Sequence, residues 1–471
     1  MNRAAGVFAD WFMSLYPDQS RPIVVVAGTG NNGGDGVAVA RFLHESQFAA
    51  KLAVCDFDTR HSADFDQQMT LLQDGVTPAT LKNAGEAADF LTGLPENTLF
   101  IDALFGTGLN RPLTGEWAGL ISLLNGHPGE MVSIDIPSGL LVDQTTPGDA
   151  VIRADRVLTF ETPKRAFFFP ENEKFTGKWE FRSIHLHPDY GRITNTPFHY
   201  LTGEEAQKMI KSRNTFSHKG THGHALIIAG SYGKMGAAVL ASRACLRAGA
   251  GLLTVHTPRC GYAVLQTAVP EAMYSSDHRA QFLSDIPGQD NFSAVGVGPG
   301  IGQAPETARA LEKLLCQYHT PLVLDADALN LLALNRDWFD LLPENTIMTP
   351  HPKEFERLFG KTPDSFARNE LQREMAQRYR AIIILKGAFT AVALPDGSCW
   401  FNSSGNPAMA TAGAGDVLTG IITGLLAQGC SPSGAALLGV WAHGRAGDAA
   451  VESTGRKSLI AGDIIDFIFR H

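Results

Sequence analysis

The chain has 471 residues, which is too long for one hydrophobic core, so we expect two domains. Its 44% hydrophobic and 18% charged residues exclude a disordered chain. A net charge of −9 without any dense Lys/Arg block argues against a nucleic-acid partner.

The first residues predict an amphipathic helix, because Val7, Phe8, Trp11, Phe12 and Leu15 recur at helical spacing. The six cysteines form no CxxC pair, and no apolar run is long enough to cross a bilayer. We therefore expect a cytoplasmic protein with no membrane partner.

From Ile23, strand-like and helix-like runs alternate as IVVVA, GVAVARFLHES, KLAVC, TLFID, GLISLLN and MVSID. This alternation predicts a parallel sheet covered by helices. The pattern weakens between Ile152 and Tyr200, and a second α/β series begins at HALIIAG. We predict two α/β domains, residues 1–200 and residues 201–471.

The first glycine-rich loop, GTGNNGGDG from Gly28 to Gly36, follows a strand-like run and opens a helix-like one. Backbone N–H groups in this context can hold an anion. The GxGxxG match, with Asp56 after the next strand, leaves an NAD-dependent dehydrogenase as one alternative. The embedded NNGGD favours a different nucleotide site. A Rossmann turn needs only close approach of the backbone at this point, whereas Asn31, Asn32 and Asp35 add polar side chains.

Two carboxylates close later strand-like runs, Asp102 in TLFID and Asp135 in MVSID. The carboxyl ends of parallel strands line the ligand crevice. Either residue alone could simply cap a turn. The presence of both carboxylates at the same sheet edge as NNGGD favours a binding site.

The runs VVVAGTGNNGGDGVAVARFL, IDALFGTGLNRPLTG and SIDIPSGL resemble the NAD(P)HX epimerase domain of the bifunctional NAD(P)H-hydrate repair enzymes. The resemblance implies a Rossmann-like domain that interconverts the R and S hydrates of NADH and NADPH. It also implies a further amino-terminal segment that this chain lacks, and a homo-oligomer.

The same resemblance implies a catalytic Asp135 and a potassium ion bound by Asn32, Asp102 and Ser138. Oxygen ligands suit such a hard cation. The implied substrate-binding residues are Asn31, Asn32, Gly33, Gly34, Asp35, Gly106, Thr107, Gly108, Leu109, Asn110, Arg111, Pro112 and Asp135.

The second half contains AIIILKGAFT, a strand-like run that ends in a glycine turn after Lys386, and GAGD at Gly413 to Asp416 before an apolar helix. The glycines can direct N–H groups at a phosphoryl group, and Asp416 can accept a proton from an attacking hydroxyl. Asp416 could instead only cap the helix. Its combination with Lys386 and the glycines favours a kinase-like site.

GAGD resembles the ribokinase-like superfamily. Together with SHKGTHGHALIIAGS, RAGAGLLTVHT, VGPGIG, LDADALNLL and TPHPKEFERL, it resembles the ADP-dependent NAD(P)HX dehydratase domain. The resemblance implies that ADP phosphorylates the C6 hydroxyl of the S-hydrate with Asp416 as base. Loss of phosphate then restores the ring double bond, and AMP and phosphate leave.

The implied residues of this half fall into two sets. Ala250, Gly300, His351 and Asp416 would bind the hydrated nucleotide; Lys386, Gly387, Ala388, Phe389, Thr390, Asn406, Gly413, Ala414 and Gly415 would bind ADP. Glu354 and Asp327 are candidates for Mg²⁺, although both could be surface or helix-start acids.

Two clusters have simpler interpretations than ligand binding. His218, His222 and His224 lack a nearby cysteine or second histidine pair, which favours a loop near the nucleotide over a metal site. The aromatic run Phe167 to Phe169 is more typical of core packing.

We therefore predict a bifunctional lyase and isomerase that acts on NADHX, NADPHX and ADP. The alternative is a small-molecule kinase, for instance of a vitamin precursor, fused to a non-catalytic nucleotide-binding module.

Overall fold

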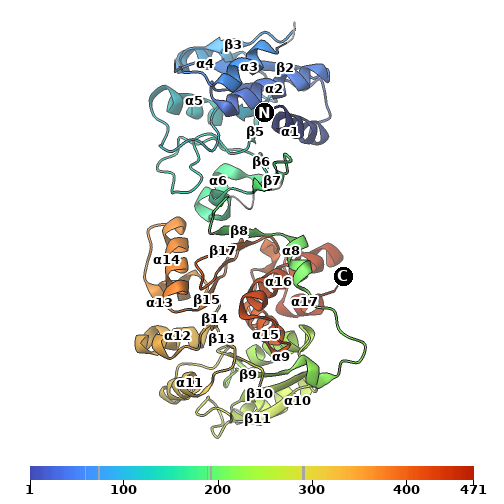
Figure 1. Ribbon diagram of the computed structural model, residues 1–471, viewed down its shortest axis with the longest axis vertical. Helices are drawn as coiled ribbons and strands as arrows, with labels where there is room; N and C mark the ends of the chain where they lie inside the picture. Colours follow the sequence, from blue (N-terminus) through green and yellow to red (C-terminus); the bar gives the residue numbers. More distant parts are fainter. Residues whose placement is uncertain (59, 73–74, 188, 191–193, 289–291, 471) are drawn as a thin grey trace. The chain divides into compact units, whose positions relative to one another are not determined.

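The computed structural model describes residues 1–58, 60–72, 75–187, 189–190, 194–288 and 292–470. The chain forms two compact units, residues 1–195 and 196–471. The boundary expected at residue 200 falls inside β8 (Phe198–Leu201), which pairs with β17 (Cys399–Asn402) of the second unit. Figure 1 labels many of the elements of both units.

The first unit contains a seven-stranded parallel sheet in the order β3-β2-β1-β4-β5-β6-β7. Successive strands are added on one side of β1 as far as β3 and on its other side from β4 onward. Ligands of such sheets bind at this switch point, between β1 and β4. The strands are β1 (Ile23–Ala27), β2 (Ala50–Cys55), β3 (Ala79–Leu81), β4 (Leu99–Ala103), β5 (Glu130–Ile134), β6 (Arg156–Phe160) and β7 (Lys178–Arg182). The α/β fold expected for this half is confirmed.

The predicted first helix is present as α1 (Asn2–Leu15), and its apolar face enters the core of the first unit. Phe8 and Phe12 are fully buried and pack in one cluster with Val25 of β1 and Leu43 of α2. The other α-helices among the described residues of this unit include α2 (Asn31–Glu45), α3 (Ala63–Thr70), α4 (Ala84–Thr92), α5 (Gly115–Gly126) and the short α6 (Glu173–Thr176).

The region of weak sequence pattern, residues 152–200, contains β6 and β7, which complete the first sheet. The expected aromatic packing is present there: Phe167, Phe168 and Phe169 are all buried. The rings of Phe167 and Phe168 lie beside Trp179 of β7. The aromatic run therefore covers the edge of this sheet.

The second unit contains a ten-stranded sheet in the order β11-β10-β9-β12-β13-β14-β15-β16-β17-β8 (Figure 1). Its strands are parallel except β16, which is antiparallel to both neighbours. Apart from β8 and β17 they are β9 (His224–Ile228), β10 (Leu252–Thr257), β11 (Met273–Ser276), β12 (Ala294–Val297), β13 (Leu322–Leu324), β14 (Ile347–Met348), β15 (Ile382–Leu385) and β16 (Ala391–Ala393).

Two hydrophobic cores cover the two faces of this sheet. One contains residues of α8 (Gly203–Met209), α9 (Met235–Arg247), α10 (Tyr262–Ala268), α15 (Ala414–Ala427), α16 (Pro432–Thr454) and α17 (Ala461–Asp466). The other contains residues of α11 (Pro305–Gln317), α12 (Asp327–Leu334), α13 (Pro352–Phe359) and α14 (Ser365–Arg378). Within the described ranges, no helix combines the length and apolar character needed to cross a membrane.

Two candidate active sites

The NNGGD motif forms the first turns of α2, directly after β1. The helix has Gly30 as its N-cap and no side-chain cap, so its first N–H groups remain available to an anion. A Cβ atom at Gly33 would lie 1.8 Å from the carbonyl oxygen of Gly28. Glycine is therefore required for the helix to start this close to the strand.

The turn from Gly106 to Pro112 lies beside this helix start. A Cβ at Gly106 would be 3.2 Å from Cβ of Asn32. Thr107, Gly108, Asn110, Arg111 and Pro112 are exposed, and Leu109 is half-buried. The structure thus brings the two predicted substrate-binding segments together at one edge of the sheet.

The three predicted potassium ligands lie around the backbone of Phe105. Asn32 Nδ2 donates to the Phe105 carbonyl at 3.1 Å, and the Phe105 N–H donates to Ser138 Oγ at 2.8 Å. Asp102 is fully buried and accepts hydrogen bonds from Ser138 Oγ at 2.5 Å, Ser138 N at 2.8 Å and Ser133 Oγ at 2.8 Å.

Asp102 has no cationic partner in the described part of the chain. Burial therefore raises its pKa, although the hydrogen bonds oppose this rise. A buried carboxylate without a cation, surrounded by hydroxyl, amide and carbonyl oxygens, fits a hard monovalent cation.

Asp135 and Asp35 lie near the same edge in different environments. Asp135 follows β5 in a left-handed conformation, with φ 65°, and its Oδ1 atom is 3.0 Å from Lys164 Nζ. Burial raises the pKa of Asp35 to about 7, and the charge of Asp135 adds to the rise. Asp35 Oδ1 is buried, and no described group donates to it.

In the second unit, a cavity of about 1070 Å³ lies where β13, β14 and β15 end and α15 begins. Eleven of the predicted residues line it, and Gly413 lies immediately before Ala414. They are His351, Glu354, Lys386, Gly387, Ala388, Phe389, Thr390, Asn406, Ala414, Gly415 and Asp416.

The amino terminus of α15 faces this cavity. Its N-cap is Gly413, with φ 86°, and the helix has no side-chain cap. Asp416 is the third helical residue, so the capping role considered from the sequence is not observed. Burial raises the pKa of Asp416 to about 6, the charge of Asp325 adds to it and Lys386 opposes it. At neutral pH this side chain is mainly a carboxylate.

Lys386 is held by a buried acid that the sequence analysis missed. Its Nζ lies 2.9 Å from Oδ1 of Asp325, whose Oδ2 accepts a hydrogen bond from Thr419 Oγ1 at 2.8 Å. Burial alone would lower the pKa of Lys386, but Asp325 and Glu354 outweigh it, so the pKa is raised. A Cβ at Gly415 would be 3.4 Å from the ammonium. The cation is therefore fixed beside the glycine turn.

His351 is the N-cap of α13. Its Nδ1 accepts from the N–H groups of Lys353 at 3.1 Å and Glu354 at 3.3 Å. Burial lowers the pKa of His351, so the ring is neutral and carries its proton on Nε2. Nε2 lies 3.4 Å from Oε1 of Glu354, a buried side chain that also lines the cavity. His351 can thus donate one hydrogen bond.

Besides Gly413, three predicted residues lie outside the cavity lining. Ala250 precedes β10, so it lies at the opposite edge of the sheet and is not brought to this site. Gly300 follows β12 at the same edge as the cavity, and a Cβ atom there would lie 3.1 Å from the Lys234 carbonyl oxygen. Asp327 accepts a hydrogen bond from the Gly302 N–H at 2.9 Å, outside the cavity.

Among the residues with described positions, His218, His222 and His224 are not part of any group of three His, Cys, Asp or Glu side chains that could hold a metal ion. His224 Nε2 instead lies 2.8 Å from Thr254 Oγ1.

Two further residues near the cavity come from α16 and were not found from the sequence. Asp448 accepts a hydrogen bond from Asn406 Nδ2 at 2.8 Å, which fixes a predicted nucleotide contact. Burial lowers the pKa of His443, which lines the cavity, to about 4. Neither follows a strand or lies in a glycine motif, so no sequence signal pointed to them.

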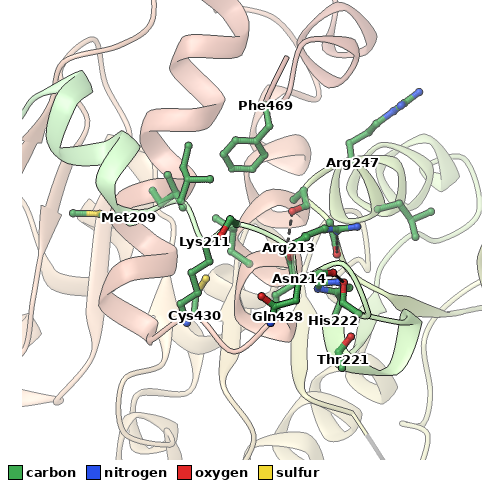
Figure 2. A pocket seen from close by; sticks show the side chains of 18 of the residues that line it. Met209, Lys211, Arg213, Asn214, Thr221, His222, Arg247, Gln428, Cys430 and Phe469 are labelled. Atoms are coloured by element: carbon green, nitrogen blue, oxygen red, sulfur yellow. Dashed lines mark hydrogen bonds between the residues drawn. The ribbon is translucent and has the colours of Figure 1, made fainter. Parts of the chain in front are cut away.

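A second pocket, of about 1040 Å³, contains none of the predicted nucleotide- or substrate-binding residues (Figure 2). Arg213 Nη2 donates to the Gly249 carbonyl at 2.8 Å, and Lys211 Nζ donates to the Gly429 carbonyl at 3.3 Å. These carbonyls follow α9 and α15, whose carboxyl ends attract cations. Lys211 and Arg213 therefore stabilise helix ends.

Comparisons with known proteins match both units. A family model described as NAD(P)H-hydrate dehydratase matches residues 225–470, and one described as YjeF-related protein N-terminus matches residues 1–166. The chain is 35% identical to the bifunctional NAD(P)H-hydrate repair enzyme Nnr of Moorella thermoacetica, over 95% of this chain and 87% of that protein. It is 36% identical to the Nnr of Escherichia coli, over 97% of this chain and 86% of that protein.

Among solved structures, the ADP/ATP-dependent NAD(P)H-hydrate dehydratase from Bacillus subtilis, co-crystallised with ATP and Mg²⁺, is similar with a TM-score of 0.52 and 32% identity. The match covers 58% of this chain and 96% of that one. A ribokinase-like superfamily protein from Enterococcus faecalis matches with a TM-score of 0.51 and 27% identity, over 59% of this chain and 95% of that one. The ribokinase-like fold expected for the second half is thereby confirmed.

Proposed function

This chain belongs to the family of bifunctional NAD(P)H-hydrate repair enzymes, and we propose that its two units catalyse two successive steps of repair. The first unit interconverts the R and S hydrates of NADH and NADPH. The second converts the S-hydrate to NADH or NADPH with ADP as phosphoryl donor, releasing AMP and phosphate.

The observation that supports the second activity best is the arrangement around α15. An uncapped helix amino terminus and the Lys386 ammonium converge on one cavity, as a phosphate group requires. Asp416 lies in the same cavity, and no described residue donates a hydrogen bond to its carboxylate. This combination suits transfer of a phosphoryl group to a hydroxyl.

In the proposed reaction, Asp416 takes the proton of the C6 hydroxyl as that oxygen attacks the β-phosphorus of ADP. The bond between the β-phosphorus and its bridging oxygen breaks, and AMP leaves with that oxygen. The C6–O bond of the phosphate ester then breaks, phosphate departs, and loss of a proton from C5 forms the double bond. Asp325 keeps Lys386 in place to hold the phosphates.

We assign ADP binding to Lys386–Thr390, Asn406 and Gly413–Gly415, and hydrate binding to Gly300, His351 and Asp416. Ala250 is left out because it lies at the other edge of the sheet. Mg²⁺, which would neutralise phosphate charge when bound, would be held by the phosphates and, through water, by Glu354. Glu354 lines the cavity with Lys386 Nζ 4.0 Å away.

In the first unit, we assign hydrate binding to Asn31–Asp35 and Gly106–Pro112, with Asp135 as the catalytic carboxylate. Asn32, Asp102 and Ser138 would hold K⁺, which would supply the positive charge that buried Asp102 otherwise lacks. A bound K⁺ would also connect the amino-terminal turn of α2, through Asn32, to the end of β4, through Asp102, and to the segment after β5, through Ser138.

The dehydratase assignment is tested by following NADH absorbance from purified S-hydrate with and without ADP. We expect recovery only with ADP, with one AMP and one phosphate formed for each NADH. Equal recovery without nucleotide would contradict the proposal, as would phosphorylation of a vitamin precursor in place of repair.

A further inference from the structure

Lys164, in the segment after β6, has an ammonium group that donates to two backbone carbonyls and forms an ion pair with Asp135. Nζ lies 3.0 Å from Asp135 Oδ1, 3.0 Å from the Phe160 carbonyl oxygen and 3.3 Å from the Thr162 carbonyl oxygen. An ammonium has three N–H donors, so each of them can be satisfied. The two carbonyls thus fix the position of a cation that also contacts the proposed catalytic carboxylate.

The two oxygens of Asp135 have unequal surroundings. Besides Lys164, Oδ1 accepts from Thr159 Oγ1 at 2.9 Å and from the Phe160 N–H at 3.0 Å. Within the described parts of the chain, no group donates to Oδ2. One oxygen is therefore anchored to the end of β6, and the other is left for a ligand.

Burial makes this ion pair different from ordinary surface pairs. The side chains of Lys164 and Asp135 are each only 14% exposed. Removing the ammonium would leave a partly buried carboxylate without its cation, close to the carboxyl group of Asp35. The carboxylate would be expected to turn away toward water.

We propose that Lys164 is a positioning residue for epimerisation, which holds Asp135 through Oδ1 so that Oδ2 faces the hydrated nicotinamide. Lys164 does not contact the substrate and acts through Asp135. This inference rests on the epimerase function proposed above for the first unit.

The test uses the full chain and purified R-NADHX without ADP, with the S-hydrate that forms separated by chromatography. Lys164→Met should lower kcat by about 10- to 100-fold, if loss of this ion pair costs as much as loss of a hydrogen bond to a charged group. KM should stay near the parent value, because Lys164 does not bind the substrate. Lys164→Arg should recover most of the rate, because a guanidinium can donate to the same oxygen.

Two controls separate this role from general damage. Lys174→Met removes an exposed ion pair of the same unit, in which Lys174 Nζ lies 2.7 Å from Asp149 Oδ1, and should epimerise at the parent rate. ADP-dependent recovery of NADH from S-hydrate should be unchanged in every variant. If Lys164→Met does not fold, Lys164→Gln replaces it; this variant keeps a donor but loses the charge, so kcat should fall less than in Lys164→Met but still measurably.

A folded Lys164→Met or Lys164→Gln variant with parental kcat would overturn the positioning role, as would a loss confined to KM. Failure of the parent chain itself to epimerise R-NADHX would instead overturn the proposed epimerase function, and this inference with it.

Discussion

Replacing Asp416 by asparagine isolates its role as a base, because the two side chains have nearly the same shape. Loss of a positioned general base typically lowers a rate by about 10²- to 10⁴-fold, or about 2.7 to 5.4 kcal/mol of barrier. ADP should still bind near the parent affinity, because Lys386 and the uncapped amino terminus of α15 remain.

Stability should not fall in this variant. The folded pKa of Asp416 is raised to about 6 by burial, so the stability linked to this group is present at low pH and lost as pH rises. At neutral pH the ionised side chain is thus unfavourable, and asparagine removes that charge. The capping geometry is also unaffected, because the N-cap is Gly413.

The assay compares the parent, Asp416→Asn and a control, Asp337→Asn, which changes an exposed aspartate. Each receives S-NADHX and ADP, and NADH absorbance, ADP affinity and Tm are measured. We expect the control to match the parent, and Asp416→Asn to bind ADP and melt normally but scarcely turn over. Recovery of NADH by folded Asp416→Asn at close to the parent rate would refute the mechanism.

Three further predictions follow from the same contacts. Because Asp416 acts as the carboxylate and its pKa is about 6, kcat/KM for S-hydrate should fall about tenfold per pH unit below pH 6. If kcat/KM stayed unchanged down to pH 5, this prediction would be contradicted. Asp135→Ala should slow epimerisation of R-hydrate by about 10²- to 10⁴-fold and leave ADP-dependent repair of S-hydrate intact, whereas an equal loss of both would show that the two activities are not separable. Asn32→Ala should lower the K⁺ bound per chain in elemental analysis, and unchanged stoichiometry would exclude Asn32 as a ligand.

The fold could be predicted from the sequence where strands are apolar throughout. IVVVA and TLFID correspond to β1 and β4, in which every residue is buried. Because nearly every position of these strands is apolar, the sequence alone predicts them. β7 was missed because it lies at the sheet edge: its sequence KWEFR is only half-buried or exposed, so its composition resembles that of a loop. β8 was missed for a similar reason, since its first three residues are half-buried.

The candidate sites were predictable where a glycine motif or a strand end marks them. Asp325 also follows a strand, yet the neighbouring Asp327 was selected, because the sequence LDADAL does not show which carboxylate turns inward. The structure decides this: Asp325 is 1% exposed and pairs with Lys386, whereas Asp327 accepts hydrogen bonds outside the cavity. Lys164 and His443 are single residues of ordinary segments, and their roles depend on contacts with residues distant in the sequence.

The central claim is that one chain performs both repair steps. It is tested most directly by supplying the full chain with purified R-NADHX and measuring NADH with and without ADP. We expect complete recovery of NADH with ADP, and only a mixture of R and S hydrates without it. R-NADHX that remains unchanged beyond its spontaneous rate, while S-NADHX is consumed under the same conditions, would contradict the account.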